Sequence, residues 1–505
     1  MVTEPTAAGL DAAQLAGTGD MPVETFRAAA HRVVDLMADY LRDLETHPVL
    51  PPVRPGELAA RLAREVPTRP EPLDAILDDI ASSVVPNITH WQHPAFFAFF
   101  PSTAAAPGIL GEMLTAALVA NAMLWRTSPV ATELEGIVVG WLREAFGLPE
   151  AFDGLLTDTA STSSLTALAA ARQAATGDAA ADGIAAGPRL RIYASTEAHS
   201  SIEKAAMTLG IGRAGVRRIG TDASLAMDPA ALATAIEEDR AAGWEPCAVV
   251  ATIGTTSSTA IDPVAAIAEI AARERVWLHV DAAYAGVVAL VPERRGDFAG
   301  WERADSIVVN PHKWLFVPLD CSLLLSRRLE VVRDAFSLVP EYLRTTGGAG
   351  SGRDYNEYSP MLGRRFRALK AWMLVRYFGL DGLRTRIEEH IALAQRLAQC
   401  IDADEDAERL APVPFATVCF RWRPARLAGR ETEPEVAAVL DALNEALMAR
   451  VNETGEAFLS HTKLRGRYTI RLSIGNPRTE WRHVERTWTL IRSIGHELDT
   501  TAVAR

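Results

Sequence analysis

Apolar positions follow two different rhythms along the chain, and the change falls near Gly154. From Pro22 the pattern is helical, with Phe26, Val33, Val34, Met37 and Leu41 at spacings near three and four, and further helices are expected up to Phe146. From Gly154 onward, short apolar runs alternate with stretches of helical spacing. Repeated strand–helix–strand units with apolar strands predict an α/β fold, in which a mainly parallel sheet is covered by helices on both faces.

The boundaries of the predicted elements follow from these rhythms. In the first part, a proline-rich break at 48–55 precedes helices expected at 57–65, 72–85, 107–127 and 130–146. In the α/β part we expect strands at 155–157, 189–194, 248–254, 276–281, 306–310 and 322–326. The helices between them are expected at 161–173, 200–209 and 263–273. Beyond these, helices at 364–377 and 383–401 and strands at 415–422 and 468–474 predict a small α+β domain.

The same pattern predicts how the chain is divided. A small, polar tail at 1–20 is expected to be disordered, and it is followed by a helical arm at 21–105, a large domain at 106–395 and a small domain at 396–505. The helices of the arm are short and loosely connected, so a second copy of the chain is the natural surface for them to pack on. The glycine-rich stretch 345–359 is expected to be a mobile loop that covers an active site.

Composition and charge narrow the possible functions. With 505 residues the chain can form two or three packed units, and its net charge of -13 argues against nucleic acid or an anionic membrane as a partner. The apolar stretch 104–124 contains Glu112 and is interrupted by Pro107, which favours a buried helix over a membrane span. Four widely spaced cysteines and no signal-peptide pattern favour a reduced, cytoplasmic protein without a metal site.

The strongest candidate for chemistry is Lys313, in the sequence NPHKW at residues 310–314. It follows a predicted apolar strand, at the place where open α/β sheets hold their ligands. Only four lysines occur among the 51 lysines and arginines of the chain. A lysine at this position therefore favours chemistry that arginine cannot perform, such as Schiff-base formation. A lysine that simply caps a strand end is the alternative.

Polar residues also follow three other predicted strands. Asp281 would need a cationic partner such as a protonated pyridine nitrogen, and the small Ala283 beside it would let a flat ring approach. His199 could stack on such a ring, and the turn 157–161 has the small hydroxyl residues and helix N-terminus of a phosphate site. Helix capping and an ordinary loop histidine explain each feature when it is taken alone. Together with Lys313, they describe pyridoxal phosphate (PLP) held as a lysine Schiff base.

Two motifs in this order and spacing, HVDAAYAG at 279–286 and NPHKW at 310–314, resemble those of the PLP-dependent group II decarboxylases, in particular the aromatic-L-amino-acid decarboxylases. The resemblance runs from about Met21 to Ile494 and includes THWQHPAFFAFFP, YASTEAHSSIEKA, ATIGTT and LGRRFRALKAW. It implies PLP as the cofactor, the architecture of fold type I PLP enzymes, and a homodimer in which the N-terminal arm is swapped between subunits.

The resemblance also implies roles for individual residues. Lys313 would form the Schiff base, Asp281 would keep the pyridine nitrogen protonated, and His199 would stack on the ring and position the substrate. Tyr342 would be the catalytic tyrosine of the mobile loop. Further cofactor contacts would come from Ala160, Ser161, Thr256, Ala283, Asn310 and His312. The substrate side chain would meet Trp91, Phe99, Phe100, Pro101, Ser102 and Gly363, where glycine leaves room for a ring as large as indole.

The expected reaction is decarboxylation of tryptophan, phenylalanine, tyrosine or DOPA to the amine. An aldehyde synthase is the alternative, but relatives of that type usually carry phenylalanine where this chain has Tyr342. The aromatic segment 91–101 disfavours glutamate as substrate, and the complete set of candidate catalytic residues disfavours a non-catalytic PLP-binding scaffold. The turn 158–162 and the segment 354–361 differ from many relatives, so the phosphate donors and the preferred substrate stay open.

Overall fold

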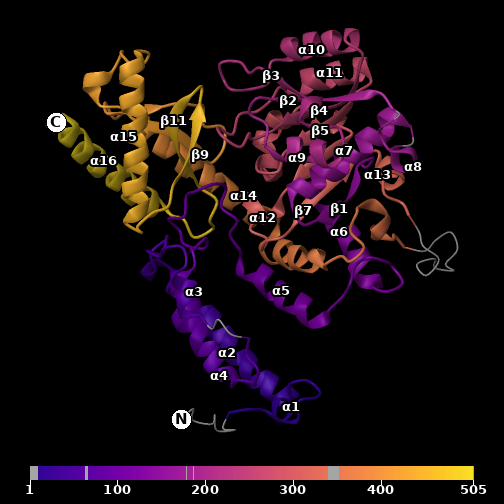
Figure 1. Ribbon diagram of the computed structural model, residues 1–505, viewed down its shortest axis with the longest axis vertical. Coiled ribbons are helices and arrows are strands. Elements are labelled where there is room, and N and C mark those ends of the chain that lie inside the picture. The colour runs from indigo at the N-terminus through magenta and orange to yellow at the C-terminus, as the bar shows by residue number, and fades with distance from the viewer. Residues whose placement is uncertain (1–8, 63–65, 178, 186, 339–351, 504–505) are drawn as a thin grey trace. The chain divides into compact units, whose positions relative to one another are not determined.

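The computed structural model of the protein describes residues 9–62, 66–177, 179–185, 187–338 and 352–503 (Figure 1). The chain divides into two compact units. The larger unit contains residues 97–444 and 460–481, and the smaller unit contains the residues up to 96 together with 445–459 and those from 482 onward. The domain boundaries expected from the sequence stay a prediction.

A seven-stranded sheet forms the centre of the larger unit, with the strand order β1-β7-β6-β5-β4-β2-β3. Neighbouring strands from β3 to β6 pair in parallel, whereas β7 runs antiparallel to both β1 and β6. The bounds are β1 Asp153–Thr157, β2 Arg189–Ser195, β3 Val216–Ile219, β4 Trp244–Thr252, β5 Trp277–Asp281, β6 Ser306–Val309 and β7 Ser322–Ser326. The predicted α/β class with a mainly parallel sheet is confirmed.

Helices cover both faces of this sheet, and strands such as β5 are therefore buried at every position. On one face α7 (Ala160–Thr176) packs against α9 (Ser201–Thr208), and α10 (Pro229–Ala241) packs against α11 (Val264–Glu274). Helix α9 connects β2 to the edge strand β3, whereas α11 connects β4 to β5, in the opposite direction along the sheet. Because such crossovers are right-handed, the two helices lie on opposite faces. The sheet and its two helical layers hold most of the buried core.

A second, smaller sheet in the same unit has four antiparallel strands in the order β10-β11-β9-β8. The bounds are β8 Ala407–Arg409, β9 Thr417–Trp422, β10 Ser460–Leu464 and β11 Arg467–Ser473. The long helix α14 (Arg367–Asp402) precedes this sheet and is kinked at Gly379. The φ of Gly379 is 65°, a conformation that favours glycine, which explains why the sequence pattern predicted two helices here.

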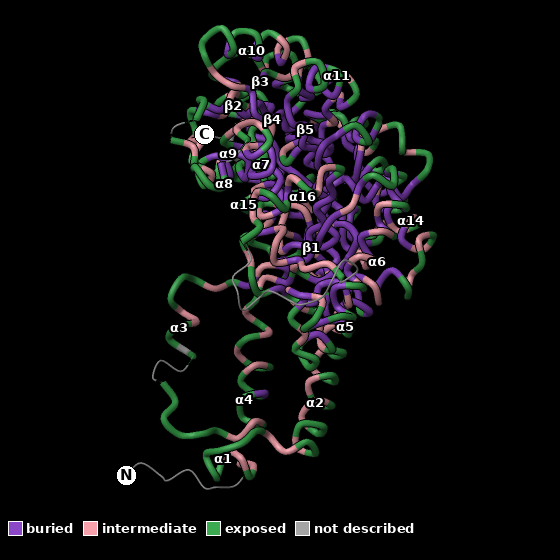
Figure 2. The backbone as a smooth tube through the Cα atoms, turned by 90° about the vertical axis from the view of Figure 1, so that its right-hand side faces the viewer, coloured by how far each residue is buried: buried purple, intermediate pink, exposed green. Residues whose placement is uncertain are grey.

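The N-terminal helices of the smaller unit bury few side chains of their own. α2 (Val23–Arg42) has no buried residue, and α4 (Leu73–Asp79) buries Leu77. Arg32 of α2 lies beside α4, with which it forms ion pairs through Asp74 and Asp78. Figure 2 shows α2 and α4 almost entirely in the colours of exposed and intermediate residues. The remaining main helices are α1 Ala12–Ala16, α3 Glu57–Arg61, α5 Ala106–Leu118, α6 Pro129–Ala145, α15 Pro434–Glu453 and α16 Trp481–Val503.

Several expected elements differ from the structure. The helix expected at 107–127 is α5, which ends at Leu118 because Val119 adopts a left-handed conformation with a φ of 51°. Strand β3 was missed because its sequence, VRRI, is too polar to form an apolar run. Helix α1 lies inside the tail that was expected to be disordered. No helix in the described part of the chain is both long and apolar enough to cross a membrane.

Candidate active site

A cavity of about 350 Å³ lies where the central strands of the large sheet end. It is lined in turn by residues that follow β1, β2, β4, β5 and β6, namely Ser161, His199, Thr256, Ala283 and Lys313. Parallel strands end at one edge of a sheet, which is why residues far apart in the sequence meet here. Five more predicted residues line the same cavity: Phe99, Phe100, Ala160, Asn310 and His312. Asp281, the last residue of β5, lines it as well.

Lys313 reaches the cavity from α12 (Pro311–Trp314), a single helical turn that follows β6 directly. Its Nζ lies 5.2 Å from the centre of the Phe100 ring. Burial lowers the pKa of Lys313 below that of an ordinary lysine, and the negative charge of Asp281 opposes this shift. The amine therefore loses its proton more readily than an exposed lysine, which makes it a better nucleophile.

Asp281 provides a buried carboxylate, with 6% of its surface exposed. Its Oδ1 accepts a hydrogen bond from the main-chain N–H of Ala283 at 3.1 Å. A carboxylate that is largely removed from water is stabilised by a nearby positive charge. Besides Lys313, a protonated ring nitrogen of a ligand would provide such a charge.

His199 lines the cavity in a defined tautomeric state. Its Nδ1 accepts a hydrogen bond from the main-chain N–H of Ser201 at 3.2 Å and lies 2.8 Å from the Ser201 hydroxyl. An accepting Nδ1 leaves the proton of the neutral ring on Nε2. Burial lowers the pKa of His199 further than the charge of Asp281 raises it, so the ring is neutral at neutral pH.

One part of the cavity wall is suited to an anion. Thr159, Ala160 and Ser161 lie at the amino terminus of α7, a helix of 17 residues whose first N–H groups and dipole attract negative charge. Asn310 also lines the cavity, and its buried Oδ1 has no hydrogen-bond partner among the described residues. This oxygen accepts hydrogen bonds, so a donor group of a ligand, and not the anion itself, would supply its partner.

The apolar wall of the cavity is a column of nearly parallel rings. The Phe100 and Tyr284 ring centres lie 3.8 Å apart with an angle of 13° between the planes. Tyr284 stacks in turn on Trp314, at 5.0 Å and 6°. The indole Nε1 of Trp314 donates a hydrogen bond to Nδ1 of His390 at 2.8 Å, so the column is anchored in α14. A flat apolar surface of this kind suits an aromatic ligand.

Comparison with known proteins gives the family. Residues 55–423 match the model described as the pyridoxal-dependent decarboxylase conserved domain. The chain belongs to this family. It is 38% identical to tryptophan decarboxylase 1 of Oryza sativa subsp. japonica, over 96% of this chain and 97% of that protein. It is 39% identical to phenylacetaldehyde synthase of Arabidopsis thaliana, over 94% and 96%. The crystal structure of Oryza sativa TDC with PLP and tryptamine, 38% identical, has a TM-score of 0.91 and covers 95% of this chain and 99% of that chain.

Membership makes this protein a PLP-dependent carboxy-lyase of fold type I, and confirms the family, cofactor and enzyme class expected from the sequence. The residues of the cavity fit the cofactor. They provide an amine at Lys313, a buried carboxylate at Asp281 and a helix amino terminus at Ala160. These are the groups that an aldehyde, a ring nitrogen and a phosphate require.

Other predicted site residues lie outside this cavity. Trp91 belongs to the smaller unit, where it stacks on Phe96 at 4.4 Å. Pro101 and Ser102 follow Phe100 but do not line the cavity formed by the described residues, and Gly363 is exposed. Tyr342 lies outside the described residues. The substrate-binding roles of Trp91, Pro101, Ser102 and Gly363 stay predictions.

Arg471 of β11 is a cavity residue that the sequence analysis missed. It donates hydrogen bonds to the carbonyl oxygen of Ser257 at 2.8 Å and to the hydroxyl of Ser460 at 3.1 Å. Burial lowers its pKa, and its Nη2 has no hydrogen-bond partner among the described residues. The available signal was a charged residue between the apolar positions Ile470 and Leu472 of a predicted strand.

Proposed function

We propose that this decarboxylase converts an aromatic L-amino acid, namely tryptophan, phenylalanine, tyrosine or DOPA, to its monoamine and carbon dioxide. The observation that carries the proposal is the distance of 5.2 Å between Nζ of Lys313 and the centre of the Phe100 ring. The reactive amine and a flat aromatic wall thus face one cavity. Relatives named for tryptophan, tyrosine and aromatic-L-amino-acid decarboxylation, at 37% to 38% identity, support the same substrate class.

When bound, PLP supplies an electron sink for the pair of electrons that the departing carboxyl group leaves on Cα. Lys313 would hold the cofactor through its amine, and Asp281 would hold a proton on the ring nitrogen. His199 would lie against the ring and orient the substrate. The phosphate would be held by Ala160, Ser161 and Asn310, with further cofactor contacts from Thr256, Ala283 and His312.

The residues of the chain would also control protons and water. The depressed pKa of Lys313 lets its amine release a proton before it reacts. Nε2 of His199 carries a proton that can be donated to a substrate oxygen, because Nδ1 is engaged with Ser201. Tyr342 would deliver a proton to Cα, and closure of the loop that carries it would exclude water.

A substrate panel tests the proposal directly. Purified holoenzyme would be supplied in turn with tryptophan, phenylalanine, tyrosine, DOPA and glutamate, and amine and carbon dioxide would be quantified. We expect equal amounts of both products from at least one aromatic substrate and none from glutamate. Failure with all four aromatic amino acids would refute the substrate class while leaving the family assignment intact.

An aldehyde product is the second candidate, because phenylacetaldehyde synthase of Arabidopsis thaliana is 39% identical to this chain. Tyr342 favours the amine, since aldehyde-forming relatives usually carry phenylalanine at the matching position. Hydrogen peroxide and ammonia released together with the product would establish the aldehyde-forming reaction instead.

We further propose that the protein is a homodimer that works in the cytoplasm. α2 exposes Val23 and Phe26 by 70% and 59%, which an arm packed on a second copy would cover. On α5, Leu110, Leu114 and Leu118 are exposed at a spacing of four residues, so they form one apolar helix face. Four free cysteines are consistent with a reducing compartment.

A further inference from the structure

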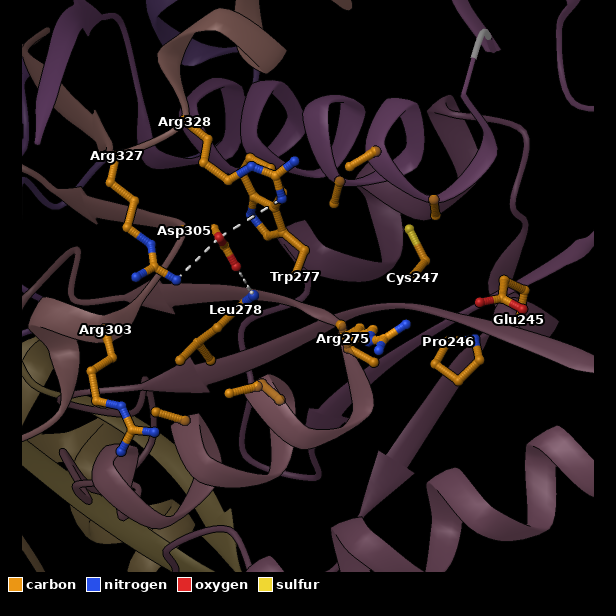
Figure 3. A pocket seen from close by; sticks show the side chains of 17 residues that line it. Glu245, Pro246, Cys247, Arg275, Trp277, Leu278, Arg303, Asp305, Arg327 and Arg328 are labelled. Carbon is orange, nitrogen blue, oxygen red and sulfur yellow. Dashed lines mark hydrogen bonds and ion pairs between the residues drawn. The ribbon is translucent and has the colours of Figure 1, made fainter. Parts of the chain in front are cut away.

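The larger unit has a second hollow, of about 460 Å³, at the edge of the sheet opposite to the active site (Figure 3). It lies at the beginnings of β4 and β5, where Glu245, Cys247 and Trp277 line it. Alanines of α7 and α11, among them Ala171 and Ala271, line its sides and leave the space open. The decarboxylation chemistry uses none of these residues.

Four arginines from three segments of the chain line this hollow. Arg275 follows α11, Arg303 precedes β6, and Arg327 and Arg328 follow β7. The only carboxylates among the described residues that line it are Glu245 and Asp305. The lining therefore carries an excess of positive charge, in a chain whose net charge is -13.

The guanidinium groups of these arginines have few partners. Asp305 accepts a hydrogen bond from the N–H of Leu278 at 2.8 Å, and it lies 3.4 Å from Arg327 and 4.0 Å from Arg328, as the dashed lines of Figure 3 show. Arg303 approaches Glu269 only to 3.8 Å. Arg328 also lies over the Trp277 ring, 5.1 Å from its centre. Many other paired arginines of the described chain come closer to their carboxylates.

The ion pairs on other surfaces give the comparison. Arg217 lies 2.6 Å from Glu238, and Arg409 lies 2.9 Å from Asp402. The chain has 64 acidic residues for 51 lysines and arginines, so carboxylates are in excess overall. The four arginines of the hollow thus keep most of their N–H donors available to a ligand.

The four arginines do not serve to cap the carbonyl groups at the ends of neighbouring helices. The carboxyl ends of α7 and α11 point toward this edge, and their carbonyl groups attract cations. Arg240 is used in this way, because its Nη2 donates to the carbonyl oxygen of Glu274 at 2.8 Å. Among the described residues, no such side-chain bond to a carbonyl is made by Arg275, Arg303, Arg327 or Arg328.

We propose that this hollow binds a small polyanion of the phosphate class, such as inorganic phosphate, pyrophosphate or a phosphate ester. Each guanidinium presents a planar fork of donors that matches phosphate oxygens. A planar carboxylate is satisfied by one or two forks in its own plane. A tetrahedral phosphate can accept forks from several directions, which suits arginines that arrive from separate segments.

Calorimetric titration of the holoenzyme tests the site. Phosphate, pyrophosphate and succinate would be titrated separately at fixed pH and ionic strength. We expect pyrophosphate to bind more tightly than phosphate, and both more tightly than succinate, with an affinity that falls as potassium chloride is raised. The double variant R275Q/R303Q should bind pyrophosphate at least about tenfold more weakly.

A matched control variant is R430Q, because Arg430 is exposed and paired with Glu433 at 2.8 Å, away from the residues of the hollow. It should bind pyrophosphate as the parent protein does. The bound-cofactor absorbance and the decarboxylation rate should be unchanged in both variants, since neither replacement touches the active site.

Three outcomes would overturn the proposal. The site does not exist if the parent protein gives no saturable binding of pyrophosphate, or if the double variant binds it with the parental affinity. The phosphate class is wrong if succinate binds as tightly as pyrophosphate. Displacement of the cofactor during the titration would place the anion in the active site instead.

Discussion

The indole Nε1 of Trp314 donates a hydrogen bond to Nδ1 of His390 at 2.8 Å, and Nε2 of His390 donates to the carbonyl oxygen of Asn476 at 3.0 Å. This pair joins the turn that carries Lys313 to the long helix α14. Trp314 in turn supports Tyr284 and Phe100 in the column of rings that walls the cavity. His390 is therefore a positioning residue for a surface that it does not itself form.

We expect H390L to weaken substrate binding and lower stability. The variant leaves the buried N–H of Trp314 without an acceptor, which costs about 1–3 kcal/mol. If about 1 kcal/mol of this cost is lost from the free energy of substrate binding against Phe100, KM rises about fivefold. The kcat should change less. Steady-state kinetics and the thermal unfolding midpoint would measure both effects.

The glutamine variant separates positioning from packing. H390Q keeps an oxygen that can accept from Trp314 and an amide that can donate to Asn476. Its KM should lie close to that of the parent protein, although its side chain lacks the ring. Equal KM values for H390L and the parent protein would show that the column does not depend on this hydrogen bond.

The two central residues of the site have separable effects. K313R should abolish decarboxylation, because a guanidinium cannot act as the nucleophilic amine. Borohydride reduction of the holoenzyme followed by peptide mapping should place the cofactor on Lys313. D281N should retain covalent attachment but lower kcat by about 10²–10³-fold, the usual effect of losing one electrostatic contact in an active site.

Attachment of the reduced cofactor to another lysine would contradict these roles, and so would normal turnover by K313R. The matched control is K463R, which changes one of the three other lysines of the chain. Lys463 lies in β10 and is not among the residues that line the cavity, so this variant should keep full activity.

The sequence indicated which strand-end residues share one cavity better than it indicated strand direction. Lys313 and Asp281 were found because both follow apolar strands, and the ends of parallel strands meet in space. The direction of β7 could not be predicted from its apolar run. Only residues 310–321 separate it from β6, and this connection holds a single helical turn, too short for the crossover that a parallel pair requires.

Residues that act through tertiary contacts were harder to predict. Arg471 lies in the small sheet, and its place in the cavity depends on how that sheet packs against the loops after Phe99 and Ser257. Trp91 was grouped with Phe100 because the two are close in sequence. The two residues belong to different units of the described chain, so the role predicted for Trp91 stays a prediction.

The dimer can be tested through α5. We expect L114E to weaken self-association, because a charge would be buried in an apolar face that includes Leu110 and Leu118. Light scattering over a concentration series should show monomer at concentrations where the parent protein is dimeric. In the monomeric fraction, activity should fall if both subunits contribute to each site.

The control for this variant is E133Q, which removes a negative charge from α6 and adds no charge to α5. It should leave the molar mass unchanged. A parent protein that is monomeric at all concentrations would refute the dimer, and a dimeric L114E would exclude α5 from the interface.

Acid should destabilise the fold well above the usual pKa of carboxylates. Burial lowers the pKa of His279, His312 and His390 to about 4. The unfolded chain binds these protons near pH 6.5, so stability is lost as the pH falls from about 6.5 toward 4. Each histidine costs on the order of 2 kcal/mol by pH 5. The thermal unfolding midpoint at constant cofactor saturation should therefore fall steadily from pH 7 to 5.

One buried group opposes this trend. Burial raises the pKa of Asp262 to about 6, so the folded state takes up this proton before the unfolded chain does and gains stability as the pH falls. This single gain is smaller than the loss from three histidines. H390Q should flatten the profile, because glutamine does not titrate. A midpoint that stays constant between pH 7 and 5 would mean that these histidines are protonated in the folded protein.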